Sequence, residues 1–302
     1  MSATIPYDEF GYFHENAQEM GLTLQHPPAV RREGVDVGDG RRLSALVWGT
    51  EAPELVLLHG GAQNAHTWDS VALALGHPLV AVDLPGHGHS DGPRSSSLDV
   101  RDNADDVAAA VKLLAPKAKA VVGMSLGGLT ALALADRHRD LVRAVVLVDI
   151  TPGVTSGKSA QISAFVNGPE SFASFDDILA RTMEFNPTRS EASLRRGILH
   201  NAVQRDDGSW VWRYARHRVF GGPERAYPDF AGLWDAVERL RVPLLLVRGM
   251  RPQSVVSDED EHGLLRRQPS ASVVHVDEAG HSVQGDAPLD LARLLDGFVS
   301  GL

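Results

Sequence analysis

Short apolar runs bounded by turn residues recur along the chain. They are rich in Val and Leu and too short for buried helices, so we interpret them as strands. The predicted strands are Leu43–Trp48, Leu55–Leu58, Leu79–Val82, Ala120–Val122, Ala144–Val148, Leu244–Val247 and Ser272–Val276. Helical spacing of apolar residues predicts helices between several of them, at Asp99–Leu114, Leu126–Arg137, Asp258–Arg267 and Ala287–Val299. This alternation predicts an α/β fold with a mostly parallel sheet covered by helices on both faces.

The interval 151–242 interrupts this alternation. It contains helical patterns at Phe175–Glu184 and Glu191–Gln204, but no clear strand. The interval is too long for a loop within a compact domain, so we predict an inserted helical lobe. The predicted division is a core of residues 29–150 and 243–302, a helical cap insertion of residues 151–242 and a loosely packed N-terminal extension of residues 1–28.

The composition of the chain argues against several kinds of binding partner. The chain has 302 residues and a formal net charge of -10, which argues against nucleic acid and anionic lipid surfaces as partners. The absence of cysteine excludes disulfides, thiolate metal sites and a cysteine nucleophile. No apolar run approaches the roughly 20 residues of a membrane span, and the start of the sequence lacks the pattern of a signal peptide. We therefore expect a cytoplasmic protein, whose oligomeric state the sequence leaves open.

The residues Gly123-Met124-Ser125-Leu126-Gly127 lie between a predicted strand and a predicted helix. They match G-x-S-x-G, which in this position forms a sharp strand-to-helix turn. Glycines on both sides leave room for the strained backbone, and the turn lifts the serine hydroxyl clear of the sheet. We predict that Ser125 is a nucleophile rather than an incidental serine in a glycine-rich turn.

A serine nucleophile needs hydrogen-bond donors for the oxyanion that forms on its substrate. The amide of Leu126, at the start of the following helix, is suited to this role. The turn HGG that begins at His59 can direct a second amide to the same place, and we predict that this is the amide of Gly61. His59 itself is predicted to be a structural, hydrogen-bonded turn residue rather than a base.

The nucleophile also needs a base. His281 lies in the sequence DEAGHSVQGD, between the last predicted strand and the last predicted helix, and is predicted to be that base. Asp149 ends the strand Ala144–Val148, which a right-handed crossover places next to the nucleophile strand. Asp149 is therefore the preferred acid, while Asp258 or Asp260 and a Ser–His dyad without an acid remain as alternatives.

Five segments together resemble the α/β-hydrolase superfamily, in particular its cap-bearing serine esterases of actinobacterial type. They are LLHGGAQNAHTW (Leu57–Trp68), VDLPGHGHS (Val82–Ser90), VVGMSLGG (Val121–Gly128), LVDITP (Leu147–Pro152) and GHSVQGDAP (Gly280–Pro288). The resemblance covers about residues 30–300 and implies the α/β-hydrolase fold and hydrolysis, without specifying a substrate. The chain order of nucleophile, acid and histidine also agrees with this superfamily.

The chain departs from the superfamily in the loop that follows the strand Leu244–Val247. Many relatives carry a carboxylate there within a few residues, and the equivalent position here falls near Ser254. The next carboxylates, from Asp258 to Asp260, follow Ser257 in a pattern typical of a capped helix N-terminus. The segment LVDITP resembles the one that supplies the acid in some cap-bearing esterases, which also favours Asp149.

Two other patterns suggest different chemistry. HGHSD (His87–Asp91) resembles the H-x-H-x-D of binuclear metallohydrolases, but Gly92 replaces the histidine that usually follows, so we predict no metal site there. WVWRYARHR (Trp210–Arg218) could suggest a nucleic-acid stripe, but at the net charge of -10 we predict a buried or pocket-lining segment of the lobe.

These features predict a serine esterase that needs no cofactor and no metal, and whose partner is a small-molecule ester. The alternatives are C–C bond or thioester hydrolysis with the same residues, or a non-catalytic ligand-binding protein of this fold. A lobe over Ser125 should restrict substrates to short and medium acyl chains. The predicted apolar walls of its pocket are Phe165, Phe172, Phe175, Phe185, Trp210 and Trp212.

Overall fold

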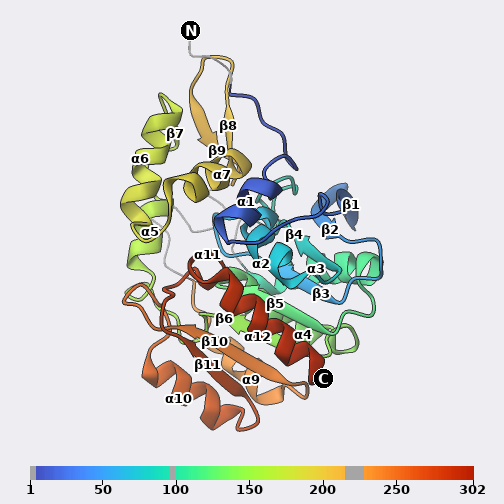
Figure 1. Cartoon of the computed structure of the whole chain (residues 1–302). Helices are drawn as coiled ribbons and strands as arrows, with labels where there is room; N and C mark the ends of the chain where they lie inside the picture. Colours follow the sequence, from blue (N-terminus) through green and yellow to red (C-terminus); the bar gives the residue numbers. More distant parts are fainter. Residues whose placement is uncertain (1–4, 96–98, 215–227) are drawn as a thin grey trace.

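The centre of the molecule is an eight-stranded sheet with the order β1-β2-β4-β3-β5-β6-β10-β11 (Figure 1). The computed structural model describes residues 5–95, 99–214 and 228–302. β1 pairs antiparallel with β2 and β2 with β4, and all other pairs are parallel, so the predicted α/β fold is confirmed. The strands are β1 (Val30–Gly38), β2 (Arg41–Trp48), β3 (Leu55–Leu58), β4 (Leu79–Val82), β5 (Ala120–Met124), β6 (Val145–Val148), β10 (Leu244–Gly249) and β11 (Ser272–Val276).

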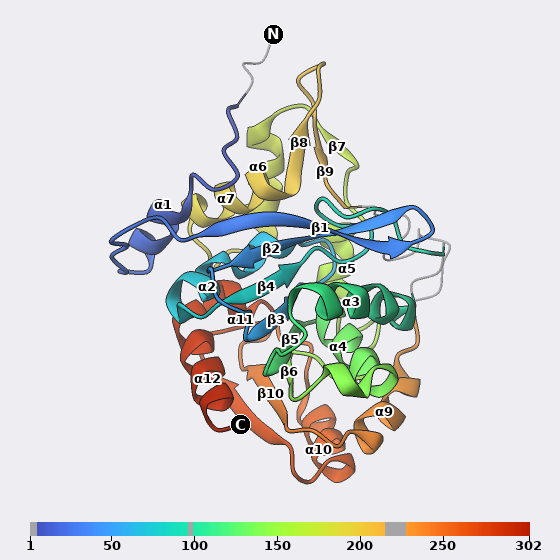
Figure 2. The same cartoon turned by 90° about the vertical axis from the view of Figure 1, so that its right-hand side faces the viewer.

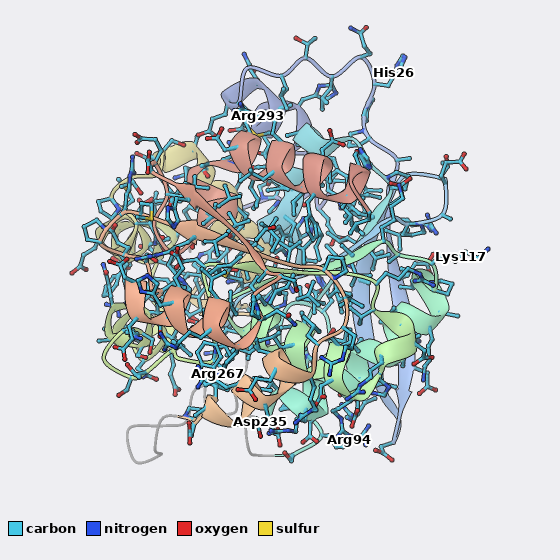
Figure 3. All side chains as sticks on the ribbon, turned by 90° about the horizontal axis from the view of Figure 1, so that it is seen from below. His26, Arg94, Lys117, Asp235, Arg267 and Arg293 are labelled. Atoms are coloured by element: carbon cyan, nitrogen blue, oxygen red, sulfur yellow. The ribbon has the colours of Figure 1, made fainter. Side chains whose placement is uncertain are left out.

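Helices cover both faces of this sheet. One face carries α3 (Val100–Leu114), α4 (Leu126–Arg137), α9 (Trp234–Arg239) and α10 (Asp258–Arg267). The other carries α1 (Phe13–Glu19), α2 (Asp69–Leu75), α11 (Val283–Asp286) and α12 (Pro288–Ser300). Figure 3 looks along this sandwich from below, with Arg293 of α12 and Arg267 of α10 outside opposite faces. Alternate side chains of β3 enter the two apolar layers, as the period of a strand requires.

Most of the segment between β6 and β10 forms a lobe at one end of the sheet, whereas its last helix, α9, packs on the core (Figure 1 and Figure 2). The lobe contains α5 (Ala160–Val166), α6 (Phe175–Phe185), α7 (Glu191–Asn201) and a small antiparallel sheet of β7 (Ser171–Phe172), β9 (Trp210–Trp212) and β8 (Ala202–Gln204). The prediction that this interval has no strand is wrong, because these strands are too short to show an alternating pattern. The limits 151 and 242 of the lobe stay a prediction.

The N-terminal segment packs more closely than predicted. Phe13 of α1 is only 3% exposed, and its ring centroid lies 4.9 Å from that of Trp48 in β2. Glu15 and Glu19 of the same helix form ion pairs with Arg196 of α7. The segment therefore contacts both the core and the lobe, as the position of α1 in Figure 2 also shows. Among the described residues, no helix has the length and apolar character needed to cross a membrane.

Candidate active site

Ser125 lies at a sharp turn between β5 and α4. Its φ of 51° and ψ of -119° fall outside the regions that L-residues favour. A Cβ atom on Gly127 would overlap the carbonyl group of Leu58, and one on Gly123 would overlap the backbone of Gly127. The glycines of G-x-S-x-G are therefore required by the close approach of backbone segments around the serine. Ser125 lines a cavity of about 230 Å³.

Backbone strain is concentrated around this turn. Ala62, Ser125 and Asp149 have φ values of 61°, 51° and 47°, and Ala62 and Asp149 follow two strands that flank the serine strand β5. The remaining described non-glycine residue with a positive φ is Asp39, in the turn between β1 and β2. Such a conformation costs about 1–3 kcal/mol per residue and persists only where the surrounding structure holds it. The fold thus fixes three unfavourable backbone positions at one edge of the sheet.

An acid–histidine pair lies at the same edge. Asp149 follows β6 and has no solvent exposure, and His281 follows β11 and lines the same cavity as Ser125. The Nδ1 atom of His281 donates a hydrogen bond of 2.9 Å to Oδ2 of Asp149. This leaves Nε2 of the imidazole as the nitrogen that can accept a proton.

Three further donors surround the carboxylate of Asp149. The amide of Gly249 and the hydroxyl of Ser254 donate to Oδ1 at 3.0 and 2.6 Å, and the amide of Val255 donates to Oδ2 at 3.0 Å. These bonds satisfy a charged group that is removed from water. Ser254 stands where relatives were expected to carry a carboxylate, and its contribution to the site was not predicted.

The alternative acids lie elsewhere. Asp258 pairs with Arg248 at 2.8 Å, and its side chain is 81% exposed. Asp260 accepts hydrogen bonds from Ser257 in the capping box of α10 and pairs with Lys158 at 2.6 Å. Neither carboxylate contacts His281 among the described hydrogen bonds and ion pairs.

The two residues whose amides are predicted to bind the oxyanion line the same cavity as Ser125. Gly61 and Leu126 both belong to its wall. Leu126 is the first residue of α4, so its amide has no partner within the helix. The hydrogen bonds of the described residues include none from the amide of Gly61. The described hydrogen bonds thus give neither amide a partner, and their role as oxyanion donors stays a prediction.

Two buried histidines hold the loop that carries Gly61. His59 donates from Nδ1 to the carbonyl of Gly60 at 2.7 Å and accepts from the amide of Leu84 at 2.9 Å, as predicted for a structural turn residue. His87, from the segment HGHSD, accepts from the amide of Ala62 at 3.1 Å. Burial lowers the pKa of His59, and burial with the neighbouring His59 lowers the pKa of His87 to about 3. Both rings are thus neutral hydrogen-bond partners of the backbone.

The aromatic residues of the lobe divide between two environments. Phe165 and Phe185 line the cavity as predicted, and so does Phe230, which the sequence did not single out. The prediction is wrong for the other four residues, which do not line this cavity. Phe172, Phe175 and Trp210 build the apolar interior of the lobe, and Trp212 lines a second cavity. Within WVWRYARHR, Trp210 and Tyr214 are buried, and positions 215–218 lie outside the described residues.

A serine at a strand–helix turn, beside an acid–histidine pair at the same edge of a mostly parallel sheet, defines the class of α/β hydrolases. The chain belongs to the alpha/beta hydrolase family, whose model matches residues 55–294. The esterase Rv0045c of Mycobacterium tuberculosis is 44% identical over 300 residues, which are 97% of this chain and 96% of that protein. The sn-1-specific diacylglycerol lipase ABHD11 of Mus musculus is 28% identical over 267 residues, 82% of this chain and 81% of that protein.

Solved structures agree with this assignment. A structure of the Mycobacterium tuberculosis esterase superposes with a TM-score of 0.86 at 42% identity, covering 98% of this chain and 100% of that one. The structure of E-2-(acetamidomethylene)succinate hydrolase has a TM-score of 0.76 at 24% identity over 90% of this chain and 100% of that one, which shows the fold alone. The resemblance inferred from the five sequence segments is thereby confirmed.

Proposed function

We propose that the protein is a serine hydrolase that cleaves carboxylic esters of small molecules through an acyl-enzyme. The observation that carries this proposal is that Ser125 and His281 line one cavity, and that His281 is hydrogen-bonded to the buried Asp149 behind it. The name of the 44% identical relative, an esterase, supports the same reaction.

In the proposed mechanism, Oγ of Ser125 attacks the ester carbonyl carbon while Nε2 of His281 takes the hydroxyl proton. The amides of Gly61 and Leu126 donate to the oxyanion of the tetrahedral intermediate. The imidazolium then gives its proton to the departing alcohol, and the acyl group remains on the serine. A water molecule, deprotonated by the same imidazole, attacks the acyl-enzyme, and collapse of the second intermediate releases the acid and returns the proton to Ser125. Asp149 holds the ring in the required tautomer and stabilises its charge.

Acyl chain length should decide the rate of hydrolysis. The cavity at Ser125 is about 230 Å³, and Phe165 and Phe185 of the lobe form part of its wall. We expect p-nitrophenyl butyrate and hexanoate to have a higher kcat/KM than emulsified long-chain triglycerides, because the latter exceed the enclosed volume. A faster reaction with the emulsified lipid would contradict the proposed role of the lobe.

The series of p-nitrophenyl esters is also used to distinguish ester hydrolysis from thioester hydrolysis. A matched thioester of the preferred acyl group is included, since the same residues could cleave it, and a higher kcat/KM for the thioester would change the assigned class. One solved structure of the Mycobacterium tuberculosis esterase belongs to work on transition metal inhibition of that enzyme. Every assay is therefore run with and without a chelator.

Replacing Ser254 by alanine should slow the reaction modestly. The change removes the 2.6 Å hydrogen bond to Oδ1 of Asp149 but leaves the two backbone donors in place. Because one of four hydrogen bonds to the carboxylate is lost, we expect kcat to fall by about three- to thirtyfold, equivalent to roughly 0.7–2 kcal/mol. An unchanged kcat would show that Ser254 does not help to hold the acid in position.

A further inference from the structure

A second group of titratable side chains lies where the core, the lobe and the N-terminal segment meet. We call it the joint cluster and define it as His66, Asp69 and His200. His66 belongs to the short helix η1 (Ala65–Trp68), Asp69 begins α2, and His200 lies near the end of α7. Their exposed fractions are 8%, 4% and 6%, and all three line a cavity of about 160 Å³. The proposed esterase mechanism uses none of them.

The atoms of the joint cluster are spaced as metal ligands would be. One nitrogen or oxygen atom from each residue lies within 4.8 Å of the other two. Nδ1 of His66 is 2.8 Å and Nε2 of His200 is 3.9 Å from Oδ2 of Asp69. Ligand atoms around a tetrahedral ion with bonds of about 2.0–2.2 Å are about 3.3–3.6 Å apart. The two distances to Asp69 are within about 0.6 Å of that spacing. The rings of His66 and His200 are stacked at 3.8 Å with an interplanar angle of 13°, so at least one ring must rotate before both nitrogens face one ion.

The remaining ring nitrogens already have the partners that metal-bound histidines have. Nε2 of His66 lies 3.1 Å from the carboxylate of Glu9, and Nδ1 of His200 lies 2.9 Å from the hydroxyl of Tyr7. Such outer contacts fix the tautomer and direct the other nitrogen of each ring to the ion. Here the other nitrogens are those nearest Asp69. The N-terminal segment thus supplies the outer shell of the site.

A buried carboxylate oxygen of Asp69 has no described hydrogen-bond partner, which favours a bound cation. Oδ1 of Asp69 is buried and accepts no hydrogen bond from a described residue, and the same holds for Oε1 of Gln284, which lines the same cavity. Unpaired buried acceptors are rare, since each loses its hydration. Arg32 already pairs with Glu9 and with Asp83, so Asp69 has no cationic side chain other than the histidines among its described ion pairs.

We propose that the joint cluster binds a divalent transition metal ion, such as Zn²⁺, which connects the lobe to the core. Two imidazoles and a carboxylate suit Zn²⁺, Co²⁺ and Ni²⁺.

Hydrogen bonds link the end of α7, which carries His200, to the loop that contains Gly61 of the candidate active site. Nδ2 of Asn64 donates to the carbonyl of His200 at 3.0 Å, and Nδ2 of Asn201 donates to the carbonyl of Ala62 at 2.7 Å. Ala62 follows Gly61, whose amide is assigned to the oxyanion. An ion at the joint cluster would therefore hold the lobe and this loop in one arrangement, and it should raise the melting temperature.

The test uses the whole chain, freed of metal by a chelator. Calorimetric titration with Zn²⁺ and visible absorption with Co²⁺ should both give one ion per chain, with the strong absorption bands of tetrahedral Co²⁺. His66→Gln, Asp69→Asn and His200→Gln should each weaken the affinity at least about tenfold, and Glu9→Gln by about 10- to 100-fold through the outer shell. The rise in melting temperature on adding Zn²⁺ should disappear in the same variants.

Two control variants locate the ion. His77→Gln removes a histidine that also lies 3.1 Å from each of two carboxylates, those of Glu54 and Asp296, but at the surface. His281→Gln removes the histidine of the candidate active site. Both should keep the affinity and stoichiometry of the parent chain. Loss of binding in His281→Gln with retention in His66→Gln and His200→Gln would overturn the proposal.

If a variant does not fold, an NMR titration of the parent chain still tests the proposed site. Nitrogen chemical shifts of the histidine rings, followed by NMR during a Zn²⁺ titration, should move for Nδ1 of His66 and Nε2 of His200. Shifts confined to other histidines, or no saturable shift, would refute the site. None of these readouts requires ester hydrolysis, so the metal site and the proposed enzymatic function can fail independently.

Discussion

Replacing Ser125 by alanine is expected to reduce ester hydrolysis by about 10⁴-fold or more, because it removes the proposed nucleophile of a set that acts as a unit. The fold should persist, since alanine keeps the Cβ atom at the strained turn between β5 and α4. The measurement is kcat/KM with the preferred p-nitrophenyl ester, accompanied by circular dichroism and a thermal melt.

A matched control is available within the same cavity. Ser163 lies on α5 and also lines the cavity at Ser125, but not at the turn. Ser163→Ala should keep activity within a few-fold, and a serine-directed phosphonate should label Ser125 in the parent chain. Labelling of another residue, or full activity in Ser125→Ala, would falsify the assignment of the nucleophile.

Replacing Asp149 by asparagine should lower kcat by about 10³- to 10⁴-fold with little change in KM. The carboxylate accepts the 2.9 Å hydrogen bond from Nδ1 of His281, and an amide there would favour the wrong tautomer of the imidazole. Some stability should also be lost, because the side chain has no exposure and the amide group would face backbone donors. Steady-state kinetics, measured well below the melting temperature of the variant, separates the loss of kcat from the loss of stability.

The two other carboxylates serve as controls for Asp149. Asp258→Asn breaks an exposed ion pair with Arg248 and should leave both kcat and stability nearly unchanged. Asp260→Asn weakens the cap of α10 and should cost about 0.5–2 kcal/mol of stability while kcat persists. If Asp149→Asn keeps a near-normal kcat and either control loses it, the acid lies after β10 rather than after β6.

The sequence predicted both fully buried strands such as β3 and β4 and more exposed elements such as β11 and α10. β3, β4 and β11 and the helices α4 and α10 have the predicted bounds. β1 was not predicted, because it is an edge strand in which charged residues such as Arg32 and Glu33 interrupt the alternation. Antiparallel pairing with β2 holds residues 30–38 in an extended strand, although their own sequence pattern does not predict one.

The local part of the candidate site could be predicted because G-x-S-x-G describes a turn within one segment. The position of Ser254 against Asp149 could not, because it depends on how two loops 105 residues apart meet. The same applies to His66 and His200, whose rings stack at 3.8 Å although they belong to the core and the lobe. No pattern around either histidine indicates its partner.

Residue type alone also could not divide the aromatic residues of the lobe. Phe175 and Trp210 pack at 5.1 Å in the interior of the lobe, whereas Phe165 faces the cavity. A lobe of this size needs apolar side chains to hold its own helices together before any remain for a pocket. Which aromatic residue serves which purpose follows only from the placement of β7, β8 and β9.

The ion pairs of α1 join segments that are far apart in the sequence. Glu15 contacts Arg196 across 181 positions of sequence. Contacts of such separation form late, because the entropy of closing the loop must be lost before they contribute. During synthesis the N-terminal segment leaves the ribosome before α7, and the turn that carries Ser125 is made between the two. We therefore expect docking of the first helix to be among the last folding events, detectable as a slow phase in the fluorescence of Trp48.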